Sequence, residues 1–479
     1  MNFNKKRRDF LKTSGLVLSG LFILPSGIIS CKDSKKKGID RKISPSDKIN
    51  MAFVGIGNRG GQVFSNFMQL GLVNNVAFCD TDMGAQQTLK AISEYPDVPR
   101  FKDFRVMFDK MANKIDAVCI CVPDFSHFPI TMLSMALGKH VYVEKPLSRT
   151  FYEAELLMAA AERHGVVTQM GNQGHSGENY FQFKEWQKAG IIKDVTRVTA
   201  HMNNSRRWHG WDTNMKFFPE AQTIPDTLDW NTWLTTAQEH GYHKDFVNGQ
   251  WRCWYDFGMG ALGDWGAHIM DSVHEFLNLG LPYEVDPVRI EGHNPLFFPQ
   301  TTTLDFKFPE RNNMPACTIS WFDGVNNIPE IPKGYGISEL DPNIPATGEG
   351  NIKPAKLNPG KIIYSNDLIF KGGSHSSPLQ IIPEEAAKDM ASKLPEVPES
   401  PSNHYDNFVL GVRGEEKVRS PFSIAGPLSQ VFCLGTIAQR LNTRIEFDRI
   451  TKQVTNNAAA NQLLIGNLPR KGWEEFYRL

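Results

Sequence analysis

The stretch that decides the fold is Met51-Ala52-Phe53-Val54-Gly55-Ile56-Gly57-Asn58-Arg59-Gly60. It leads from an apolar run, residues 49–54, through a G-x-G-x-x-G turn into a stretch with helical spacing, residues 62–70. In such a turn the first glycine permits a tight bend, the second lets the backbone approach a pyrophosphate, and the third lets helix and strand pack closely. Backbone amides at the helix start then face the anion. The stretch therefore predicts the opening strand, turn and helix of a dinucleotide-binding domain.

Asp80 supports the same prediction from the end of the second apolar run, residues 76–79. It follows the glycines by about twenty residues, the spacing at which an acidic side chain reaches a ribose hydroxyl in these domains. An acid at this position repels a 2′-phosphate, which favours NAD as the cofactor. Arg59 leaves room for NADP.

Strand-like and helix-like stretches alternate along the first third of the chain. Residues 117–122, 140–143 and 166–170 are short and nearly continuously apolar, as strands buried on both faces are. Helical spacing appears over residues 83–95, 128–137 and 150–164. This alternation predicts an α/β domain with a doubly wound parallel sheet, residues 49–173.

Two strand ends carry polar motifs toward the crevice in which open parallel sheets bind ligands. Val122-Pro123-Asp124-Phe125-Ser126-His127 follows one strand, and Glu144-Lys145-Pro146 follows the next. Pro146 restricts the backbone and could hold Lys145 in a set direction. Lys145 could also be a surface cation paired with Glu144. His127 is expected to be structural or to face the cofactor rather than to catalyse.

A further motif lies in an aromatic and glycine-rich run, residues 251–271. If the chain is helical near Gly263, Asp264 and His268 stand one turn apart on one face, where the carboxylate can orient the imidazole. This pair has the outline of a general base. The alternative is that Asp264 caps a helix and His268 is a buried, satisfied histidine.

Four motifs resemble, in kind and in order, those of the Gfo/Idh/MocA oxidoreductases, the family of glucose-fructose oxidoreductase and inositol dehydrogenase. They are Gly55-x-Gly57-x-x-Gly60, the Val122-Pro123 strand end with His127, Glu144-Lys145-Pro146 and Asp264-x-x-x-His268. The resemblance covers nearly the whole chain after Lys48, and it implies a catalytic group of Lys145, Asp264 and His268 beside the nicotinamide. The predicted cofactor site consists of Gly55, Gly57, Asn58, Arg59, Gly60, Asp80, Pro123, His127, Glu144, Lys145 and Gln173.

The periodicity changes from Gly174 onward. Residues 195–201, 288–292, 302–308 and 316–322 alternate apolar and polar, as a sheet with one wet face does. The resemblance implies an open, mostly antiparallel sheet whose far face commonly makes dimer contacts, and therefore a homo-oligomer. Helical spacing over residues 402–412 and 427–441 fits helices that pack back on the first domain. Residues 174–479 are thus predicted to form an α+β substrate-binding domain.

Many of the tryptophans gather between residues 206 and 265, next to polar side chains. An aromatic surface with a polar rim suits the C–H face and hydroxyls of a carbohydrate, although at least half of these rings are expected in the core. Residues 228–234 and the run at Trp251 resemble a secreted bacterial branch of the family. The predicted substrate site consists of Lys145, His175, Arg206, Trp208, Trp251, Asp264 and His268.

Residues 323–399 are rich in Pro, Gly and Asn, and their periodicity is weak. This composition predicts long loops. They are either a solvated insertion or a cover over the site to which Gly372-Gly373-Ser374-His375 contribute.

Composition excludes some classes of partner. The chain of 479 residues carries 52 basic and 52 acidic side chains, so no overall field favours nucleic acid. Cys119 and Cys121 are expected to share one face of a strand in the core. No second Cys or His pair stands at ligand spacing, so no metal site is predicted.

The N-terminal residues are expected to be separate from the fold. Arg7-Arg8-Asp9-Phe10-Leu11-Lys12 has the twin-arginine pattern, and an apolar run, residues 16–29, leads to Ser30-Cys31. This predicts an export signal, residues 1–31, with a lipid on Cys31, and a solvated linker, residues 32–48. A short membrane anchor or a plain signal peptide is the alternative. Either way, the protein is predicted to be exported by a bacterium, as a periplasmic or membrane-anchored lipoprotein.

These features predict an NAD(P)-dependent oxidoreductase that takes a hydride from a sugar or cyclitol hydroxyl carbon. His268 is expected to accept the hydroxyl proton, Asp264 to orient the imidazole, and Lys145 to stabilise the developing negative oxygen. Because free NAD is not expected outside the cytoplasm, the cofactor should be exported tightly bound and then reset on the enzyme. An NAD-dependent glycosidase acting by oxidation, elimination and reduction is the alternative, and a non-catalytic glycan-binding lipoprotein is the second.

Overall fold

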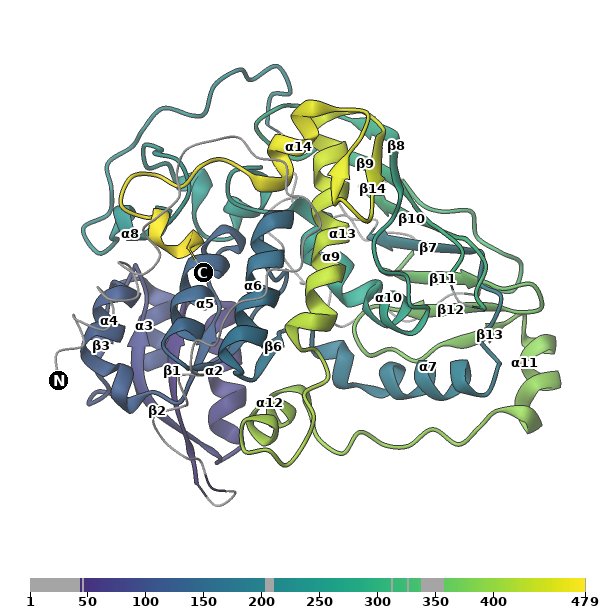
Figure 1. The fold of residues 1–479 in the computed structure, drawn as a ribbon, viewed down its shortest axis with the longest axis horizontal. Coiled ribbons are helices and arrows are strands. Elements are labelled where there is room, and N and C mark those ends of the chain that lie inside the picture. Colours follow the sequence, from purple (N-terminus) through teal and green to yellow (C-terminus); the bar gives the residue numbers. More distant parts are fainter. Residues whose placement is uncertain are drawn as a thin grey trace.

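The computed structural model describes residues 44, 47–202, 211–311, 313–324, 327–336 and 357–478. The predicted export signal with Cys31, nearly all of the predicted linker, and both Arg206 and Trp208 lie outside these ranges. The described chain contains two sheets with helices packed between and around them (Figure 1). None of the described helices is long and apolar enough to cross a membrane.

The first sheet has six strands in the order β3-β2-β1-β4-β5-β6, and every neighbouring pair is parallel. The strands are β1 (Ile49–Val54), β2 (Val73–Cys79), β3 (Arg100–Phe101), β4 (Ala117–Ile120), β5 (His140–Val143) and β6 (Thr168–Met170). The helices between them are α2 (Arg59–Gln69), α3 (Gln86–Ile92), α4 (Phe104–Met111), α5 (Asp124–Ala136) and α6 (Phe151–His164). This strand order is that of the doubly wound dinucleotide-binding fold, which confirms the predicted fold class.

Local signals explain why some of these elements are visible in the sequence and others are not. Helix α6 starts where predicted because Thr150 and Glu153 form a capping box, and it ends at Gly165 in the left-handed conformation. The sequence does not predict β3 or α4. β3 is two residues long and lies partly exposed at the sheet edge, so no apolar run marks it.

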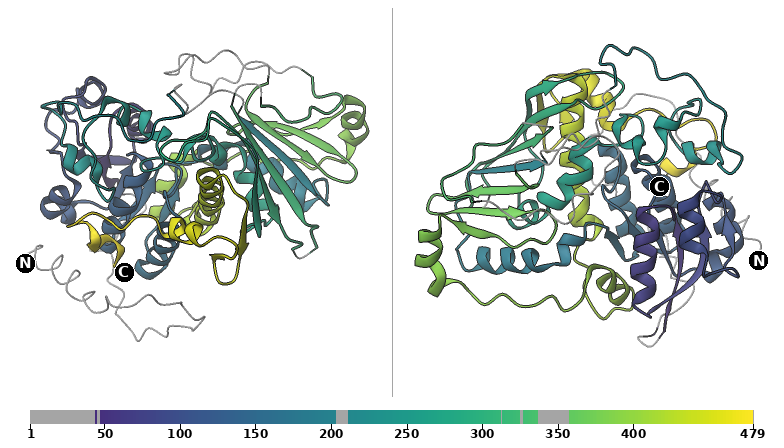
Figure 2. Two further views of the ribbon diagram at one scale, coloured as in Figure 1. Left: turned by 90° about the horizontal axis from the view of Figure 1, so that it is seen from above. Right: turned by 180° about the vertical axis from the view of Figure 1, so that it is seen from behind.

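The second sheet has nine strands in the order β13-β12-β11-β7-β10-β9-β8-β14-β15. Only the pair β10 and β7 is parallel, so the predicted mostly antiparallel sheet is confirmed. Figure 2 shows these strands gathered on one side of the molecule and the first sheet on the other. The strands are β7 (Arg197–Met202), β8 (Glu284–Glu291), β9 (Thr301–Phe308), β10 (Cys317–Asp323), β11 (Gly360–Tyr364), β12 (Ile369–Gly373), β13 (Gln380–Ile382), β14 (Ile445–Asp448) and β15 (Gln453–Val454).

The prediction of long loops over residues 323–399 is wrong for much of that stretch. It contains the three strands β11, β12 and β13 and the helix α11 (Glu384–Met390). The strands are short, β11 and β12 contain glycine, and β11 buries Lys361 completely. A charged residue facing inward and glycines without side chains remove the apolar alternation by which strands are recognised.

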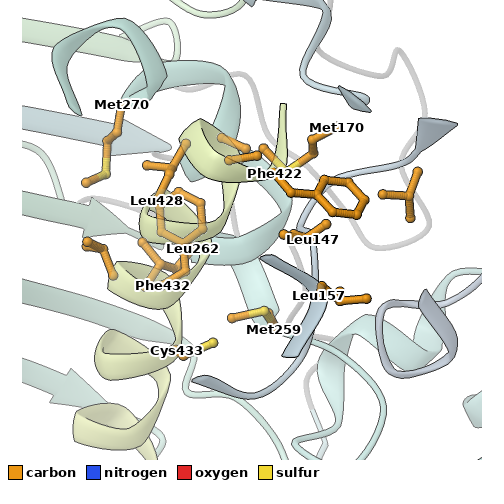
Figure 3. Packing of buried hydrophobic residues seen from close by; sticks show 14 of the residues in the cluster. Leu147, Leu157, Met170, Met259, Leu262, Met270, Phe422, Leu428, Phe432 and Cys433 are labelled. Atoms are coloured by element: carbon orange, nitrogen blue, oxygen red, sulfur yellow. The ribbon is translucent and has the colours of Figure 1, made fainter. Parts of the chain in front are cut away.

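Helix α13 (Phe422–Leu441) packs on both halves of the protein, against α6 of the first domain and against α9 (Gly260–Ile269) of the second. Figure 3 shows this packing, with Leu262 of α9 and Phe432 of α13 in one apolar cluster together with Leu147 and Leu157 from the first domain. The remaining helices of the second half include α7 (Glu178–Lys188), α8 (Trp230–Leu234), α10 (Asp271–Phe276), α12 (His404–Val412) and α14 (Ala458–Ile465).

Two glycines set the distance between α9 and α13. A Cβ on Gly435 would lie 2.5 Å from a methyl group of Leu262, and a Cβ on Gly266 would lie 2.8 Å from the ring of Phe432. The helices can approach this closely only without those side chains. The motif residues on α9 are therefore fixed at the seam between the two domains.

Candidate functional site

A cavity of about 1140 Å³ runs from the glycine-rich turn after β1 to helix α9 in the second domain. Its wall includes much of the predicted site, namely Gly55, Gly57, Asn58, Arg59, Asp80, Pro123, Glu144, Lys145, Gln173, Trp251, Asp264 and His268. The predicted residues Gly60, His127 and His175 are described but do not line it. The cavity lies at the carboxyl ends of the parallel strands, where ligands of this fold bind, and it exceeds the size of an ordinary small-molecule pocket.

The turn at one end of the cavity depends on two glycines. Gly55 has φ +79°, and a Cβ on it would lie 2.3 Å from the carbonyl oxygen of Cys121. A Cβ on Gly60 would lie 2.1 Å from the carbonyl oxygen of Gly55, so Gly60 packs beneath the turn instead of facing the cavity. At Gly57 a Cβ would meet only side-chain atoms, of Gln87 at 3.2 Å and of Thr88 at 3.5 Å. Gly57 thus leaves a bare backbone surface toward the cavity.

Asp80 braces this turn from the end of β2. Its carboxylate accepts hydrogen bonds from the backbone N–H of Ile56 at 2.7 Å and of Gly57 at 3.3 Å, and from that of Asp82 at 3.0 Å. Burial raises the pKa of Asp80, and these hydrogen bonds oppose that effect. Asn58, which follows the glycines, also has a left-handed φ of +46°. Such strain in a non-glycine residue is typical of ligand-binding turns.

Charged and polar side chains from distant segments meet above the turn. Arg59 pairs with Glu144 at 3.3 Å, and Gln173 donates to the same carboxylate oxygen at 3.1 Å. The Glu144 carboxylate raises the pKa of Arg59. Arg59 also donates to the hydroxyl of Tyr405 on α12 at 3.3 Å. Tyr405 lines the cavity, but no sequence motif marks it.

His127 is structural, so its assignment to the cofactor site is wrong. Its Nδ1 lies 2.7 Å from the carbonyl oxygen of Pro146, and its Nε2 lies 2.9 Å from that of Val122. Burial lowers the pKa of His127 to about 4. The ring ties together the ends of β4 and β5, which carry Pro123 and Lys145 to the cavity.

Lys145 and Asp264 form the central ion pair of the site, across the domain seam. The Lys145 ammonium donates to the Asp264 carboxylate at 2.9 Å and to the Asp264 carbonyl oxygen at 2.6 Å. Arg252 lies 3.4 Å from the same carboxylate oxygen. Burial lowers the pKa of Lys145, while the Asp264 charge raises it. Two of the three ammonium N–H groups are used by Asp264, which leaves one for a ligand in the cavity.

The predicted hydrogen-bonded pair of Asp264 and His268 is wrong. The two residues share a helix face, but no hydrogen bond joins their side chains, and Nδ1 of His268 has no hydrogen-bond partner within the described structure. The His268 ring stacks instead on His375, with ring centroids 3.9 Å apart and planes 16° apart. Burial and the neighbouring His375 and Lys145 lower the pKa of His268 far below its usual value, so the imidazole is neutral at pH 7.

Two further residues of the cavity wall, Asp124 and His375, belong to the site. Asp124 directly follows Val122-Pro123, but its place in the sequence indicates no role for it. It is buried, lines the cavity and accepts a hydrogen bond from the backbone N–H of Met259 at 3.1 Å. Burial raises the pKa of Asp124 to about 7. His375 belongs to the segment that was predicted to contribute if the region covers the site, and it lines the cavity.

His175 lies outside the cavity, which corrects its assignment to the substrate site. It is fully buried between Asp271, 3.4 Å from Nδ1, and Glu275, 2.5 Å from Nε2. Burial lowers the pKa of His175, but these carboxylates outweigh it and raise the pKa to about 9. His175 is therefore a structural cation.

The aromatic residues divide between the cavity wall and the core. Trp251, Trp233 and Trp265 line the cavity, and the guanidinium of Arg252 lies 4.0 Å from the ring of Trp251. Trp254 is completely buried, and Trp230 stacks on Trp233 at 4.6 Å. The expectation that many of these rings are structural holds for Trp230 and Trp254.

The residues at the glycine-rich end fit NAD. A bare Gly57 backbone, the first turn of α2 and the Asp80 carboxylate lie on one wall, where a pyrophosphate and a ribose would be held. Among the described residues, no cluster of three or more His, Cys, Asp or Glu side chains could hold a metal ion.

Comparison with known proteins agrees with this geometry. A family model described as an oxidoreductase family with an NAD-binding Rossmann fold matches residues 49–172. A second model, described as the C-terminal alpha/beta domain of the oxidoreductase family, matches residues 182–300.

Curated relatives carry the names of glycosidases. The chain is 27% identical over 227 residues to an alpha-N-acetylgalactosaminidase of Shewanella oneidensis, a match that covers 44% of this chain and 49% of the relative. It is 25% identical over 213 residues to a glycosyl hydrolase family 109 protein of Shewanella pealeana, covering 42% and 47%. The chain thus spans about half the length of the curated relatives it matches.

Solved structures share the fold. The WlbA dehydrogenase from Bordetella pertussis, solved in complex with NADH and UDP-GlcNAcA, matches 84% of this chain and 99% of its own at 14% identity, with a TM-score of 0.54. The aldose-aldose oxidoreductase from Caulobacter crescentus, complexed with glycerol, matches 84% of this chain and 100% of its own at 14% identity, with a TM-score of 0.52.

Proposed function

Since the chain belongs to the Gfo/Idh/MocA oxidoreductase family, we propose that it is an NAD-dependent enzyme that oxidises a hydroxyl group of a sugar or cyclitol. The observation that carries this proposal is one cavity that contains both the glycine-rich turn and the Lys145, Asp264 and His268 side chains. A nicotinamide that extends from the turn would reach these side chains. When bound, NAD supplies the acceptor for a hydride.

Residues from the two domains have different roles at the substrate hydroxyl. His268 is neutral and unprotonated, so its ring can accept the hydroxyl proton. Lys145 keeps one N–H for the oxygen on which negative charge develops. Asp264 holds Lys145 in place, because its carboxylate and carbonyl oxygens both accept from the ammonium. Toward His268 it acts only through its charge.

The substrate side of the cavity suits a carbohydrate. Trp251 and Trp265 offer aromatic surface beside the charged groups of Arg252, Lys145 and Asp264. Aromatic rings pack on the C–H face of a sugar while polar groups bind its hydroxyls. Curated relatives named as glycosidases and solved relatives with sugar-related ligands or names support this class of substrate. One experiment identifies the sugar that is the substrate, and a separate one identifies the carbon that is oxidised.

We further propose that the protein is exported with NAD already bound. The twin-arginine pattern at Arg7-Arg8 and the Ser30-Cys31 box support export and a lipid on Cys31. A trapped cofactor has to be reoxidised on the enzyme, which favours a redox-neutral cycle. The exposed side chain of Val288 on the partly exposed strand β8 of the nine-stranded sheet supports a homo-oligomer. Size-exclusion chromatography with light scattering and mass analysis of the mature N-terminus test these two points.

A second candidate function is a glycosidase that transiently oxidises its substrate. The names of the curated relatives favour it. Oxidation at one carbon acidifies the neighbouring C–H, so that a glycosidic bond can be eliminated and the product then reduced. Against this candidate, the motif Glu144-Lys145-Pro146 is intact, and it is typical of the dehydrogenases of this fold.

One experiment separates the candidates. The purified protein is denatured and the released nucleotide identified; the intact protein is then incubated with free sugars and with aryl glycosides. A sugar oxidoreductase yields an oxidised sugar together with either reduced bound NAD or a second, reduced sugar, and it releases no aglycone. A glycosidase releases the aglycone while its bound cofactor returns to the oxidised state. A protein that holds no nucleotide, has no affinity for NAD and changes neither substrate contradicts both.

A further inference from the structure

The segment between β12 and β13 brings a second imidazole to the reaction site. His375 lines the cavity, and its ring stacks on the ring of His268 at 3.9 Å. Its backbone N–H donates to the carbonyl oxygen of His268 at 2.8 Å. His375 lies more than one hundred residues from α9 in the sequence, so the fold, and no local motif, creates this contact.

The backbone of this segment is held in an unusual conformation. His375 has a left-handed φ of +53°, which is uncommon for a residue other than glycine. Two glycines allow the segment to lie close to the residues that follow β6. A Cβ on Gly174 would lie 2.6 Å from the His375 carbonyl group, and a Cβ on Gly177 would lie 2.0 Å from the side chain of Ser376. The backbone N–H of Asn179 donates to the Ser376 carbonyl oxygen at 3.2 Å.

The His375 ring is held as firmly as its backbone. The hydroxyl of Ser374, which is completely buried, lies 2.7 Å from Nδ1 of His375. The ring of Trp265 meets the ring of His375 edge-on, with centroids 5.6 Å apart. Strained positions that the surrounding structure over-determines in this way are characteristic of functional sites.

We propose that His375 is a positioning residue of the reaction site, whose stacked ring fixes the His268 imidazole and keeps it unprotonated. This role rests on the proposed function, in which His268 accepts the substrate proton. Two imidazole rings stacked at 3.9 Å cannot both be in the positively charged imidazolium form without strong repulsion. Lys145 and Arg59 add positive charge on the side of the first domain, and Asp264 adds the opposing negative charge.

The test is a titration of the histidines that needs no substrate. Protein labelled with ¹⁵N in histidine is titrated by NMR, and the His268 signals are assigned by their loss in His268→Gln. In His375→Asn we expect the His268 midpoint to rise by about one pH unit or more, because a neighbouring cationic site is removed. Asparagine tolerates the left-handed backbone at this position. In a sugar-oxidation assay the acidic limb of the pH profile should move in the same direction.

His293→Asn is the matched control, since His293 is exposed, does not line the cavity and has its Nε2 3.0 Å from the carbonyl oxygen of Arg440. Its substitution should leave His268 unchanged. An unchanged His268 midpoint in folded His375→Asn overturns the proposal, even if the enzyme oxidises sugars. If His375→Asn does not fold, Ser374→Ala serves in its place, and a midpoint identical to that of the native protein then overturns the proposal. A shifted midpoint in a protein that oxidises no sugar leaves the electrostatic coupling intact and contradicts only the proposed function.

Discussion

The side chain of Lys145 joins the two halves of the site, since it leaves the end of β5 and pairs with Asp264 of α9, 119 residues away. A buried ammonium is costly unless it is paired, and Asp264 supplies both the charge and two acceptor atoms. Replacing Lys145 by Ala removes the donor to the substrate oxygen while the glycine-rich turn stays intact. We therefore expect turnover to fall by at least about 100-fold with NAD affinity largely kept, as measured by steady-state kinetics and by calorimetric titration with NAD.

Lys307→Ala controls for loss of a lysine in general. Lys307 pairs with Glu284 on the partly exposed surface of the second sheet and does not line the cavity. This variant should keep native turnover. Near-native activity of Lys145→Ala would remove Lys145 from the reaction.

Asp264→Asn tests the corrected partner of Lys145. The Asp264 charge raises the pKa of Lys145 against the effect of burial, so its loss should lower that pKa further. Lys145 then loses its proton at a lower pH. The alkaline limb of the kcat/KM profile should move down by about one pH unit or more. An alkaline limb that stays in place would contradict this partner; a downward move of the acidic limb does not, because the Asp264 charge also raises the pKa of His268.

Residue spacing alone could not reveal this pairing. The sequence correctly places Asp264 and His268 on one face of a helix, but a shared face does not select a hydrogen-bond partner. The partner comes from the other domain, and His375, which stacks on His268, comes from the turn between β12 and β13, within the stretch predicted as loop. Likewise, His127 and His175 lie close to site residues in the sequence but do not face the cavity. The ring nitrogens of His127 lie against backbone carbonyl oxygens, and those of His175 lie against two carboxylates.

At the scale of elements, two glycines of the turn between β1 and α2 have different roles, one in folding and the other in ligand binding. Gly60→Ala would place a Cβ 2.1 Å from the Gly55 carbonyl oxygen, whereas the Cβ of Gly57→Ala would meet only the side chains of Gln87 and Thr88, at 3.2 Å or more. We expect Gly60→Ala to lower the free energy of unfolding by several kcal/mol. Gly57→Ala should keep the native stability but weaken NAD binding by at least about tenfold, because the new methyl group faces the pyrophosphate.

Thermal unfolding and NAD titration of both variants check this contrast. The matched pair matters because each variant adds one methyl group within the same turn. If Gly57→Ala binds NAD as the native protein does, the pyrophosphate does not lie on this turn.

Strands and helices with a continuous or regular apolar pattern can be predicted from the sequence. Elements whose side chains are fixed by contacts with distant segments cannot. The strands of the first sheet read as continuous apolar runs because both of their faces are buried. β11 hides a buried Lys361, and β12 ends in Gly372 and Gly373, so neither shows strand periodicity. β12 leads directly to His375, which explains why the sequence contains only a weak indication of that residue.

At the scale of the whole molecule, a buried ion cluster contributes stability that depends on pH. His175 of the segment after β6 lies between Asp271 and Glu275 of α10, and its pKa is raised to about 9. Because the pKa is raised in the folded state, the charged His175 contributes its full stabilisation below the unfolded pKa of about 6.5. This stabilisation is lost as the pH rises through 9. We expect the free energy of unfolding to fall by about 3 kcal/mol over this range.

Urea unfolding at a series of pH values measures this effect. His175→Gln should remove most of the slope, and His293→Gln, at an exposed histidine, should keep it. A native slope in His175→Gln would show that another group titrates.

The central claim concerns the whole molecule, because the hydride donor and acceptor are expected to meet only in the cavity between the domains. The most direct measurement is transfer of deuterium from perdeuterated sugars to NAD bound by the purified protein, followed by mass analysis of the released nicotinamide. We predict that at least one sugar transfers a single deuterium to the nicotinamide, and that Lys145→Ala abolishes the transfer. NAD that binds but acquires no deuterium from any sugar of a broad panel would contradict the account.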